Sequence, residues 1–408
     1  MSDTHADRWR FLALLAVGEL LGMSLWFAAS AVAPQLSAQW GLSAAQAGWL
    51  TTIVQLGFVV GTATAALFNL ADVMPARLLF ALAAALGAVV NASVLAAPGF
   101  PAALALRFLT GFALAGVYPP AMKMVATWFH AQRGLAIGTV VGALTVGKAT
   151  PYLIHAFPSA GAKPVLLVSS AGAIVAALLV ASFYRDGPYR FTPKAFSWGL
   201  VVSVARIREW RLATGSYLGH MFELYAFWTW IPAFLAASLA THGTKSTSIV
   251  SIVAFATIAI GGAGCVWGGL FADRKGRERL VTVSLIASGA CCLLSGLAFV
   301  APFWVVIALS LVWGFFVIAD SAQFSTLVTE SVPSHAVGTA LTLQTSLGFL
   351  LTMLPMQILP AAAERSSWQW VFAILAMGPA VGIIAIRRLR GLRLRASKDM
   401  NVEAQPTS

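Results

Sequence analysis

The sequence predicts an all-α membrane protein of twelve transmembrane helices, arranged as two six-helix halves in parallel repeat. Three observations lead to this fold class: the composition, the number of long uncharged stretches, and a repeat between the two halves of the chain. Of the 408 residues, 59% are hydrophobic and only 10% are charged, whereas soluble domains carry about 25% charged residues. A chain with so little polar surface is not a soluble enzyme, a secreted scaffold or a disordered protein.

Twelve uncharged stretches, bounded by polar residues or by Gly and Pro, are long enough to span a bilayer, which takes roughly 20 apolar residues. In the first half of the chain they are 11–33, 46–70, 78–98, 100–128, 134–157 and 164–184. In the second half they are 212–239, 246–272, 280–300, 302–326, 336–360 and 366–386. Pro101 and Pro302 separate the third span of each half from the fourth, which would otherwise read as one long helix.

The two halves repeat at an offset of about 200 residues, as expected for a duplicated transporter. Matched pairs include Gly18 with Gly215, Pro34 with Pro232, Gly61 with Gly262, Asp72 with Asp273, and Pro151 with Pro355. Matched residues share one orientation in the membrane, because six spans lie between them. In transporters with such parallel repeats, the substrate binds between the halves near the midplane.

These patterns divide the chain into four segments. Residues 1–184 form the first six-helix half, and residues 212–388 form the second. Residues 185–211 form a linker whose second part alternates apolar with charged residues, which predicts an interfacial amphipathic helix. Residues 389–408 form a basic tail, for which contact with anionic lipid headgroups and a solvated, disordered state are both open.

The distribution of Lys and Arg predicts the orientation in the membrane. Most of the 26 basic residues lie in the loops on the side of the two termini. The exceptions are Lys163, Lys245 and Arg365 in loops of the other side, and Arg107, Lys123 and Lys148 within spans. The positive-inside rule therefore predicts a multi-pass protein of the inner or plasma membrane with both termini in the cytoplasm.

A motif after the eighth span carries a family resemblance. The segment from Gly269 to Arg279, GLFADRKGRER, resembles the cytoplasmic loop motif GxLADRxGRR of the major facilitator superfamily. The matching segment from Phe68 to Arg77 keeps only the Leu-Ala-Asp core and the last Arg, and lacks the glycines and the first Arg. The resemblance extends over nearly the whole chain and implies the major facilitator fold, with transport by alternating access.

The motif also implies a cytoplasmic gate. Gly269 lets span eight pack closely on a neighbouring helix, and Asp273 can form charge-assisted hydrogen bonds with nearby Arg side chains. Such bonds latch the cytoplasmic face shut and break when it opens. The predicted gate residues are Asp72, Gly269, Asp273, Arg274, Gly276 and Arg277. The alternative for the arginines is a role in topology alone.

Basic residues within the spans indicate where an anion binds, because a buried charge faces a cavity or a partner. Arg107, followed by Gly111, resembles the span-four motif of the superfamily, and a structural ion pair is its alternative role. Lys148 lies in the outer half of span five, too deep to reach the interface easily. The predicted substrate contacts are Arg107, Lys148, Tyr118, Gln55 and Trp230.

The segment from Ala126 to Gly134 resembles superfamily members that carry small anions, such as oxalate, monocarboxylate, nitrate and cyanate porters. This chain departs from them in its basic residues. Nitrate porters have an Arg in spans two and eight, and carboxylate porters have basic residues in span eight or eleven, but the matching stretches here have neither. Drug antiporters of the superfamily have Gly-Pro in span five, where this chain has Gly142-Ala143.

Three acids lie within spans, where inserting a charged acid costs about 3 kcal/mol. Each is therefore paired or available to bind a proton. Glu223, near the middle of span seven and one turn after His220, is the first candidate for a proton site, and Glu19 in span one is the second. The predicted proton-coupling residues are thus Glu223, Glu19, His220 and Asp320. For Asp320 the alternative role is a structural polar contact, and for His220 it is a hydrogen bond in the protein interior.

The predicted function is secondary active transport of a small organic solute by alternating access. The proton is the candidate coupling ion. Arg107 and Lys148 favour an anionic solute. An exporter of amphiphilic drugs or metabolites by proton antiport is the alternative. The expected partners are the small-molecule substrate, the lipid bilayer and the coupling proton or another ion, and the protein is expected to be a monomer.

Other functional classes lack their sequence signals. The chain contains no GxSxG or HExxH motif, no ATP-binding loop and no soluble signalling domain, so no catalytic residues, cofactor or enzyme activity are predicted. Cys265, Cys291 and Cys292 lie in apolar runs without metal-ligand spacing. The net charge of +12 is spread over loops without the interleaved aromatics of a nucleic-acid groove, so no nucleic acid is expected.

Overall fold

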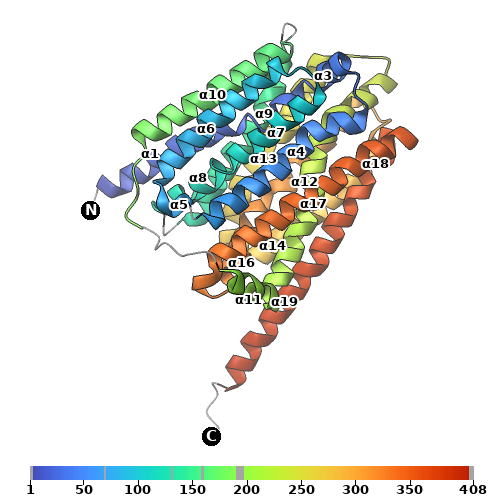
Figure 1. Ribbon diagram of the computed structural model, residues 1–408. Coiled ribbons are helices and arrows are strands. Elements are labelled where there is room, and N and C mark those ends of the chain that lie inside the picture. Colours follow the sequence, from blue (N-terminus) through green and yellow to red (C-terminus); the bar gives the residue numbers. More distant parts are fainter. Residues whose placement is uncertain (1–2, 69, 130–131, 158–159, 190–196, 404–408) are drawn as a thin grey trace.

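The computed structural model of the chain describes residues 3–68, 70–129, 132–157, 160–189 and 197–403, and of these it describes only the backbone at 3–6, 71–72, 133, 334 and 396–403. This described part is built of α-helices and short 3-10 segments, and it contains no strand. The helices lie side by side in one elongated bundle (Figure 1). The all-α prediction is therefore confirmed.

The described residues of the first half form ten α-helices. They are α1 (Asp3–Met23), α2 (Ala28–Ala31), α3 (Ala33–Trp40), α4 (Ala44–Leu67), α5 (Leu70–Val73), α6 (Ala76–Ser93), α7 (Phe100–Leu114), α8 (Tyr118–Ala126), α9 (Arg133–His155) and α10 (Ala162–Phe183). A short 3-10 segment, Val94–Ala96, extends α6.

Nine more lie in the described residues of the second half. They are α11 (Trp198–Arg206), α12 (Arg208–Thr241), α13 (Thr247–Lys275), α14 (Arg277–Ala298), α15 (Phe303–Ala319), α16 (Ser321–Glu330), α17 (Val337–Arg365), α18 (Trp368–Val371) and α19 (Met377–Glu403). The 3-10 segments Ser334–Ala336 and Phe372–Ala376 precede α17 and α19.

Eleven helical stretches of the described chain are long and apolar enough to cross a membrane, and each overlaps one predicted span. They are Ala44–Leu67, Ala76–Ala96, Phe100–Ala126, Gly134–His155, Ala162–Phe183, Arg208–Thr241, Thr247–Lys275, Arg277–Ala298, Phe303–Glu330, Val337–Arg365 and Trp368–Arg395. The remaining predicted span, 11–33, is not one continuous helix, because α1 ends at Met23 and α2 begins at Ala28.

The break in this first span is stabilised by local hydrogen bonds. Ser24 Oγ donates to the carbonyl oxygen of Leu21 at 2.7 Å and to that of Ser169 at 3.3 Å. Trp26 N donates to Met23 O at 3.1 Å and closes a tight turn. A serine that bonds to nearby backbone competes with the helix, which explains why the helix stops here within an apolar stretch. The break places Trp26 between two helix ends.

The two halves meet along two helix pairs, α9 with α13 and α4 with α17. Small residues permit the first contact: a Cβ atom on Gly142 would lie 2.9 Å from the carbonyl oxygen of Gly262, too close for any residue but glycine. The start of α1 and the far end of α19 lie at one end of the bundle, called here the terminal end (Figure 1). The opposite end, with α3 and α18, is called the distal end.

Two segments outside the predicted halves are helical. α11 lies in the predicted linker, where the amphipathic helix was expected. Residues 190–196 of that linker lie outside the described residues. α19 continues to Glu403, so most of the predicted tail is helical. A helix in the tail was not predicted from the sequence. The division of the chain at 184, 212 and 388 stays a prediction.

Candidate substrate-binding site

A cavity lies between the two halves of the bundle and is lined by side chains of both. Its first-half wall comes from the end of α1, the break that follows it, α8 and α9, and its second-half wall comes from α12, α15, α16 and α17. Aromatic side chains dominate the deeper part, and hydroxyl and amide groups line the part nearer the terminal end. Among the described residues that line the cavity, Lys148 alone carries a charge.

Lys148 is held by aromatic rings and not by an acid. Its ammonium group donates a hydrogen bond to the Tyr225 hydroxyl. It lies 4.0 Å from the ring centroid of Trp26, 4.6 Å from that of Tyr225 and 5.6 Å from that of Trp228. Cation–π contacts of this kind stabilise a desolvated ammonium. No carboxylate of the described chain forms an ion pair with it, so its charge is available to an anionic ligand.

Two indole N–H groups beside Lys148 have no acceptor. The Nε1 atoms of Trp26 and Trp228 are buried and make no hydrogen bond within the described structure. Both rings line the cavity. Buried donors nearly always have a partner in folded proteins. The deep part of the cavity therefore combines one cation with two unused hydrogen-bond donors, a set that suits a carboxylate.

Glu19 lies just behind this wall. It is fully buried, and neither carboxylate oxygen has a hydrogen-bond partner among the described residues. It interacts electrostatically with Lys148 and with Tyr118. The helices that carry Glu19 and Lys148 touch, since a Cβ atom on Gly147 would lie only 2.2 Å from the carbonyl oxygen of Leu20. The predicted proton-coupling residue of span one is thus next to the predicted anion-binding residue of span five.

Arg107 is not brought to the cavity, contrary to the expectation of a substrate contact. Its Nε donates to Leu50 O at 3.1 Å, its Nη1 to Leu25 O and Asn91 Oδ1, each at 3.1 Å, and its Nη2 to Trp26 O. The side chain is fully buried within the first half. Two of these carbonyl groups belong to the break after α1. The guanidinium fork therefore satisfies backbone acceptors that the broken helix leaves open.

The other predicted substrate contacts divide between the cavity and the distal end. Tyr118 lines the cavity at the start of α8. Gln55 donates to Met356 Sδ at 3.8 Å, and Trp230 Nε1 donates to Met356 O at 2.8 Å. Neither residue is part of the cavity wall. The structure places both at the contact between α4 and the second half, on the distal side of the cavity.

Glu223 faces the interior of the second half and not the cavity. Its carboxylate accepts hydrogen bonds from Trp313 Nε1 at 2.5 Å, Ser288 Oγ at 2.9 Å and Cys292 Sγ at 3.3 Å. These donors belong to α14 and α15. A buried carboxylate with three donors is well satisfied. The structure thus places the first candidate for a proton site in a buried polar cluster of the second half, away from the cavity wall.

His220 and Asp320 form a buried pair. His220 Nδ1 lies 3.0 Å from Asp320 Oδ1, and both side chains are 1% exposed. The His220 ring also packs on Phe324, with ring centroids 5.1 Å apart. Their chain neighbours Met221 and Ser321 line the cavity. The pair therefore lies one residue behind the second-half wall, as Glu19 lies behind the first-half wall.

The predicted gate lies at the terminal ends of α9 and α13. A Cβ atom on Gly134 would lie 3.3 Å from Asp273 Oδ1, so this carboxylate sits at the N-terminus of α9, where the helix dipole favours a negative charge. A Cβ atom on Gly269 would lie 3.3 Å from the carbonyl oxygen of Gly134. Gly276 has φ 92° and ends α13. Arg274 is exposed, and the side chain of Asp72 lies outside the described residues.

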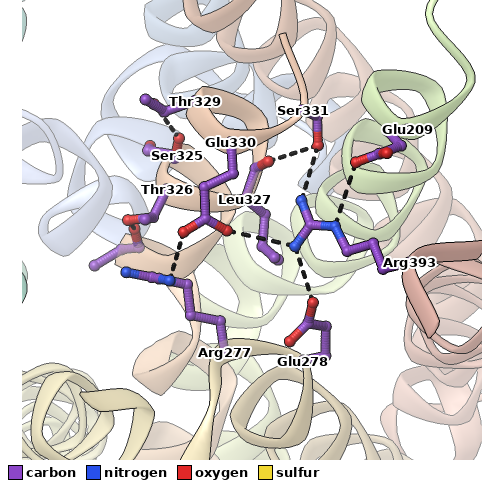
Figure 2. Close-up of polar contacts among 11 residues, drawn as sticks. Glu209, Arg277, Glu278, Ser325, Thr326, Leu327, Thr329, Glu330, Ser331 and Arg393 are labelled. Carbon is purple, nitrogen blue, oxygen red and sulfur yellow. Dashed lines mark hydrogen bonds and ion pairs between the residues drawn. The ribbon is translucent and has the colours of Figure 1, made fainter. Parts of the chain in front are cut away.

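Arg277 belongs to a cluster of charged side chains that was not predicted from the sequence. Arg277 Nη1 lies 2.5 Å from Glu330 Oε1. Arg393 of α19 contacts Glu209, Glu278 and Glu330 at 3.3, 2.9 and 3.4 Å, and donates to Ser331 Oγ at 3.2 Å (Figure 2). The acids come from the ends of three different helices. In this structure Arg277 pairs within the second half, and its role in a gate between the halves stays a prediction.

Tyr225, Trp228 and Gln344 line the cavity but were not among the predicted site residues. Tyr225 is two residues after Glu223 and points to the other side of α12. A helical plot of this span would have shown an aromatic stripe opposite the acid. Such a stripe is usual in membrane helices and does not by itself indicate a ligand site.

Comparisons with known proteins agree with this architecture. The family model described as Major Facilitator Superfamily matches residues 14–354 and 213–405. Two relatives, each named "Hexuronate transporter", come from Escherichia coli strain K12 and from Escherichia coli O157:H7; each is 24% identical over 411 residues, covering 93% of both chains. The crystal structure of the nucleoside transporter NupG superposes with a TM-score of 0.73 at 15% identity, covering 93% of this chain and 99% of that one, which is a likeness of fold.

Proposed function

The chain belongs to the Major Facilitator Superfamily and is a transporter, and from this premise we propose that it carries a small organic anion across the cell membrane by alternating access. The observation that carries the proposal is Lys148, a buried basic residue of the cavity wall that forms no ion pair with an acid among the described residues. A transporter of cations would present an acid there. The name of the hexuronate transporters supports an anionic solute, because hexuronates are carboxylated sugars.

The carboxylate of the solute would bind at the deep end of the cavity. There it would accept hydrogen bonds from Lys148 and from the unused indole N–H groups of Trp26 and Trp228. The rings around the ammonium exclude water and strengthen the attraction between the two charges. Tyr225 would give up its hydrogen bond to Lys148, or share it with the ligand.

Contacts between the halves support alternating access with the distal end closed. Gln357 Nε2 donates to Thr52 Oγ1 at 2.7 Å, and His155 Nδ1 lies 3.1 Å from Ser251 Oγ. A Cβ atom on Gly48 would lie 2.8 Å from the ring of Trp230. In contrast, the cavity wall reaches toward the terminal end as far as the exposed Ser325 of α16. The solute would leave or enter on that side in this state.

We place the terminal end in the cytoplasm and the protein in an inner or plasma membrane. The concentration of Lys and Arg in the loops of the terminal end supports this orientation. Reporter fusions at the C-terminus and in the loop around Lys245 test it. A cytoplasmic reporter active in the Lys245 loop would reverse the assignment.

We further propose that one proton moves with each anion, through Glu19. α1 packs on α8, α9 and α10. The groups of these helices that bear on Glu19 are Tyr118 and Lys148, whereas α10 presents only Lys163, exposed in its first turn. An ionised Glu19 would compete with the solute for Lys148, and a protonated Glu19 would leave Lys148 free. Proton and anion would therefore bind together and leave together.

A thermal-shift screen of the purified full-length protein in detergent tests the proposal. The panel holds carboxylates, inorganic anions, amino acids, sugars and lipophilic cations. A ligand at 100 times its dissociation constant stabilises the folded protein by about 2.7 kcal/mol, which is a measurable shift. We expect carboxylates to raise Tm in the wild type and in Lys163→Gln, which removes an exposed lysine, but not in Lys148→Gln.

Other outcomes of the screen are informative. Stabilisation by lipophilic cations and not by anions would overturn the proposal and favour an exporter of amphiphilic compounds. Anion stabilisation that survives Lys148→Gln would move the anion site elsewhere. Uptake of the stabilising compound into proteoliposomes then establishes transport.

A further inference from the structure

We infer that Gln344 recognises a hydroxyl group of the transported anion, so that the solute is a hydroxylated carboxylate such as a sugar acid or a hydroxy acid. The inference rests on the proposed function, because it concerns the same cavity. It assigns a specificity-determining residue and narrows the class of substrate.

Gln344 is a buried polar residue of the cavity wall with an unused acceptor. It is the eighth residue of α17 (Val337–Arg365) and is 2% exposed. Its Oε1 atom is buried and has no hydrogen-bond partner in the described part of the chain. An amide oxygen in this state is unfavourable, and a ligand that donates a hydrogen bond to it is favoured.

The helix that carries Gln344 is firmly placed. One turn before it, the carbonyl oxygen of Ala340 accepts a hydrogen bond from Trp210 Nε1 at 3.3 Å. One turn after it, α17 touches Tyr217, because a Cβ atom on Gly348 would lie 2.3 Å from that ring. α17 is thus fixed against α12 on both sides of Gln344. These contacts keep the backbone of Gln344 at the cavity wall, where a ligand can donate a hydrogen bond to its Oε1 atom.

The cavity-lining side chains near Gln344 are polar and uncharged, and the buried His220–Asp320 pair lies one residue behind Ser321. Tyr217, Ser321 and Thr345 line the same part of the cavity and carry hydroxyl groups. A second carboxylate here would have no cation to balance it. A hydroxyl group can both donate to an amide oxygen and accept from an amide nitrogen, so it matches a glutamine and its hydroxyl-bearing neighbours.

The positions of Lys148 and Gln344 fit two groups of one small molecule. Lys148 is fifteen residues after the start of α9, and Gln344 is seven residues after the start of α17, both counted from the terminal end. At 1.5 Å of rise per residue, Lys148 lies about 22 Å along α9 and Gln344 about 10 Å along α17, and both line the same cavity. A carboxylate at Lys148 thus leaves the hydroxyl-bearing part of the same solute beside Gln344.

Pairs of acids that differ in their hydroxyl groups test the inference. Binding of D-glucuronate and cyclohexanecarboxylate, and of lactate and propionate, is measured to the full-length protein in detergent. We expect the hydroxylated member of at least one pair to bind the wild type about 10-fold more tightly, because the site is built to pair with a hydroxyl. In Gln344→Leu this preference falls by about the same factor, through weaker binding of the hydroxylated acid alone.

Controls separate the possible failures. Gln344→Met keeps the length of the side chain and serves if Gln344→Leu does not fold, and Gln39→Leu removes an exposed amide elsewhere. The inference is overturned if both members of every pair bind equally, or if the preference for the hydroxylated acid persists in both Gln344 variants. In either case, binding that depends on Lys148 would still support the proposed function. Absence of any carboxylate binding, or binding unchanged in Lys148→Gln, overturns both.

Discussion

The first half of the molecule buries a cation against backbone carbonyl groups, whereas the second half buries an acid against side-chain donors. Both clusters occupy equivalent helices. Arg107 of span four and Asn91 of span three meet the backbone of span one, and Trp313 of span ten and Cys292 of span nine meet Glu223 of span seven. The two halves thus keep a polar centre at the same place but reverse its charge.

The difference follows from one helix. Span one is broken after Met23, so carbonyl oxygens without helical partners point at Arg107. Span seven is the unbroken helix α12, and at its polar centre the acceptor is a side chain, Glu223. The break lets Trp26 turn into the cavity and support Lys148. The first half therefore supplies the charge of the site, and the second half supplies most of its wall.

The largest expected effect comes from Arg107→Leu. It leaves three buried carbonyl oxygens and Asn91 without their donor, at a cost of about 3 kcal/mol or more. We expect a large fall in Tm, followed by fluorescence during heating in detergent. Arg107→Lys keeps the charge but loses the fork, and should recover only part of the stability.

The opposite result for Arg107→Leu would support the prediction from the sequence that Arg107 contacts the substrate. If Arg107→Leu keeps the wild-type Tm and abolishes anion binding, then Arg107 contacts the solute directly, and the comparison of the two clusters as structural centres fails.

Glu223→Gln should have the next largest effect. The amide offers one acceptor oxygen in place of two, so at least one of the three donors loses its acceptor, and we expect a loss of about 2 kcal/mol in stability. Anion affinity and its pH dependence should remain. The measurement is Tm together with anion binding at two pH values. A variant of normal Tm whose anion binding no longer responds to pH would make Glu223 the proton site.

Glu19→Gln tests the charge of the first half. In the wild type, falling pH protonates Glu19 and frees Lys148, so anion affinity should rise by up to about 10-fold per pH unit when one proton binds with each anion. The neutral glutamine should bind the anion at all pH values with little change. Titration of anion binding from pH 5 to pH 8 checks this. A wild-type affinity that does not vary with pH removes Glu19 from coupling.

Arg393→Ala should have the smallest effect. Its three acidic partners are partly exposed, and exposed ion pairs contribute about 1 kcal/mol or less. We expect a Tm lowered by a few degrees at low salt and a smaller difference at high salt, because salt screens exposed charges. A large loss that does not depend on salt would mean that α19 holds the second half together by more than these ion pairs.

The membrane class and the order of the spans were determined by the sequence alone. Hydrophobic stretches of bilayer length must be helical, because the bilayer offers no partner to an open backbone. Thus eleven of the predicted spans recur as apolar helices. The same pattern could not show the break in span one. Its residues are apolar, and the break depends on Ser24 and on Arg107, which is far along the chain.

The sequence predicted which charged residues are candidates for the site, and the tertiary structure decided which of them lie at the cavity. The rarity of charges in spans singled out Lys148, Arg107, Glu19 and Glu223, since each is costly in a membrane. Which of them shares a cavity depends on helix rotation and on contacts between spans that are distant in sequence. Packing set Arg107 against carbonyl groups and Glu223 against Trp313, and it left Lys148, with Glu19 behind it, at the space between the halves.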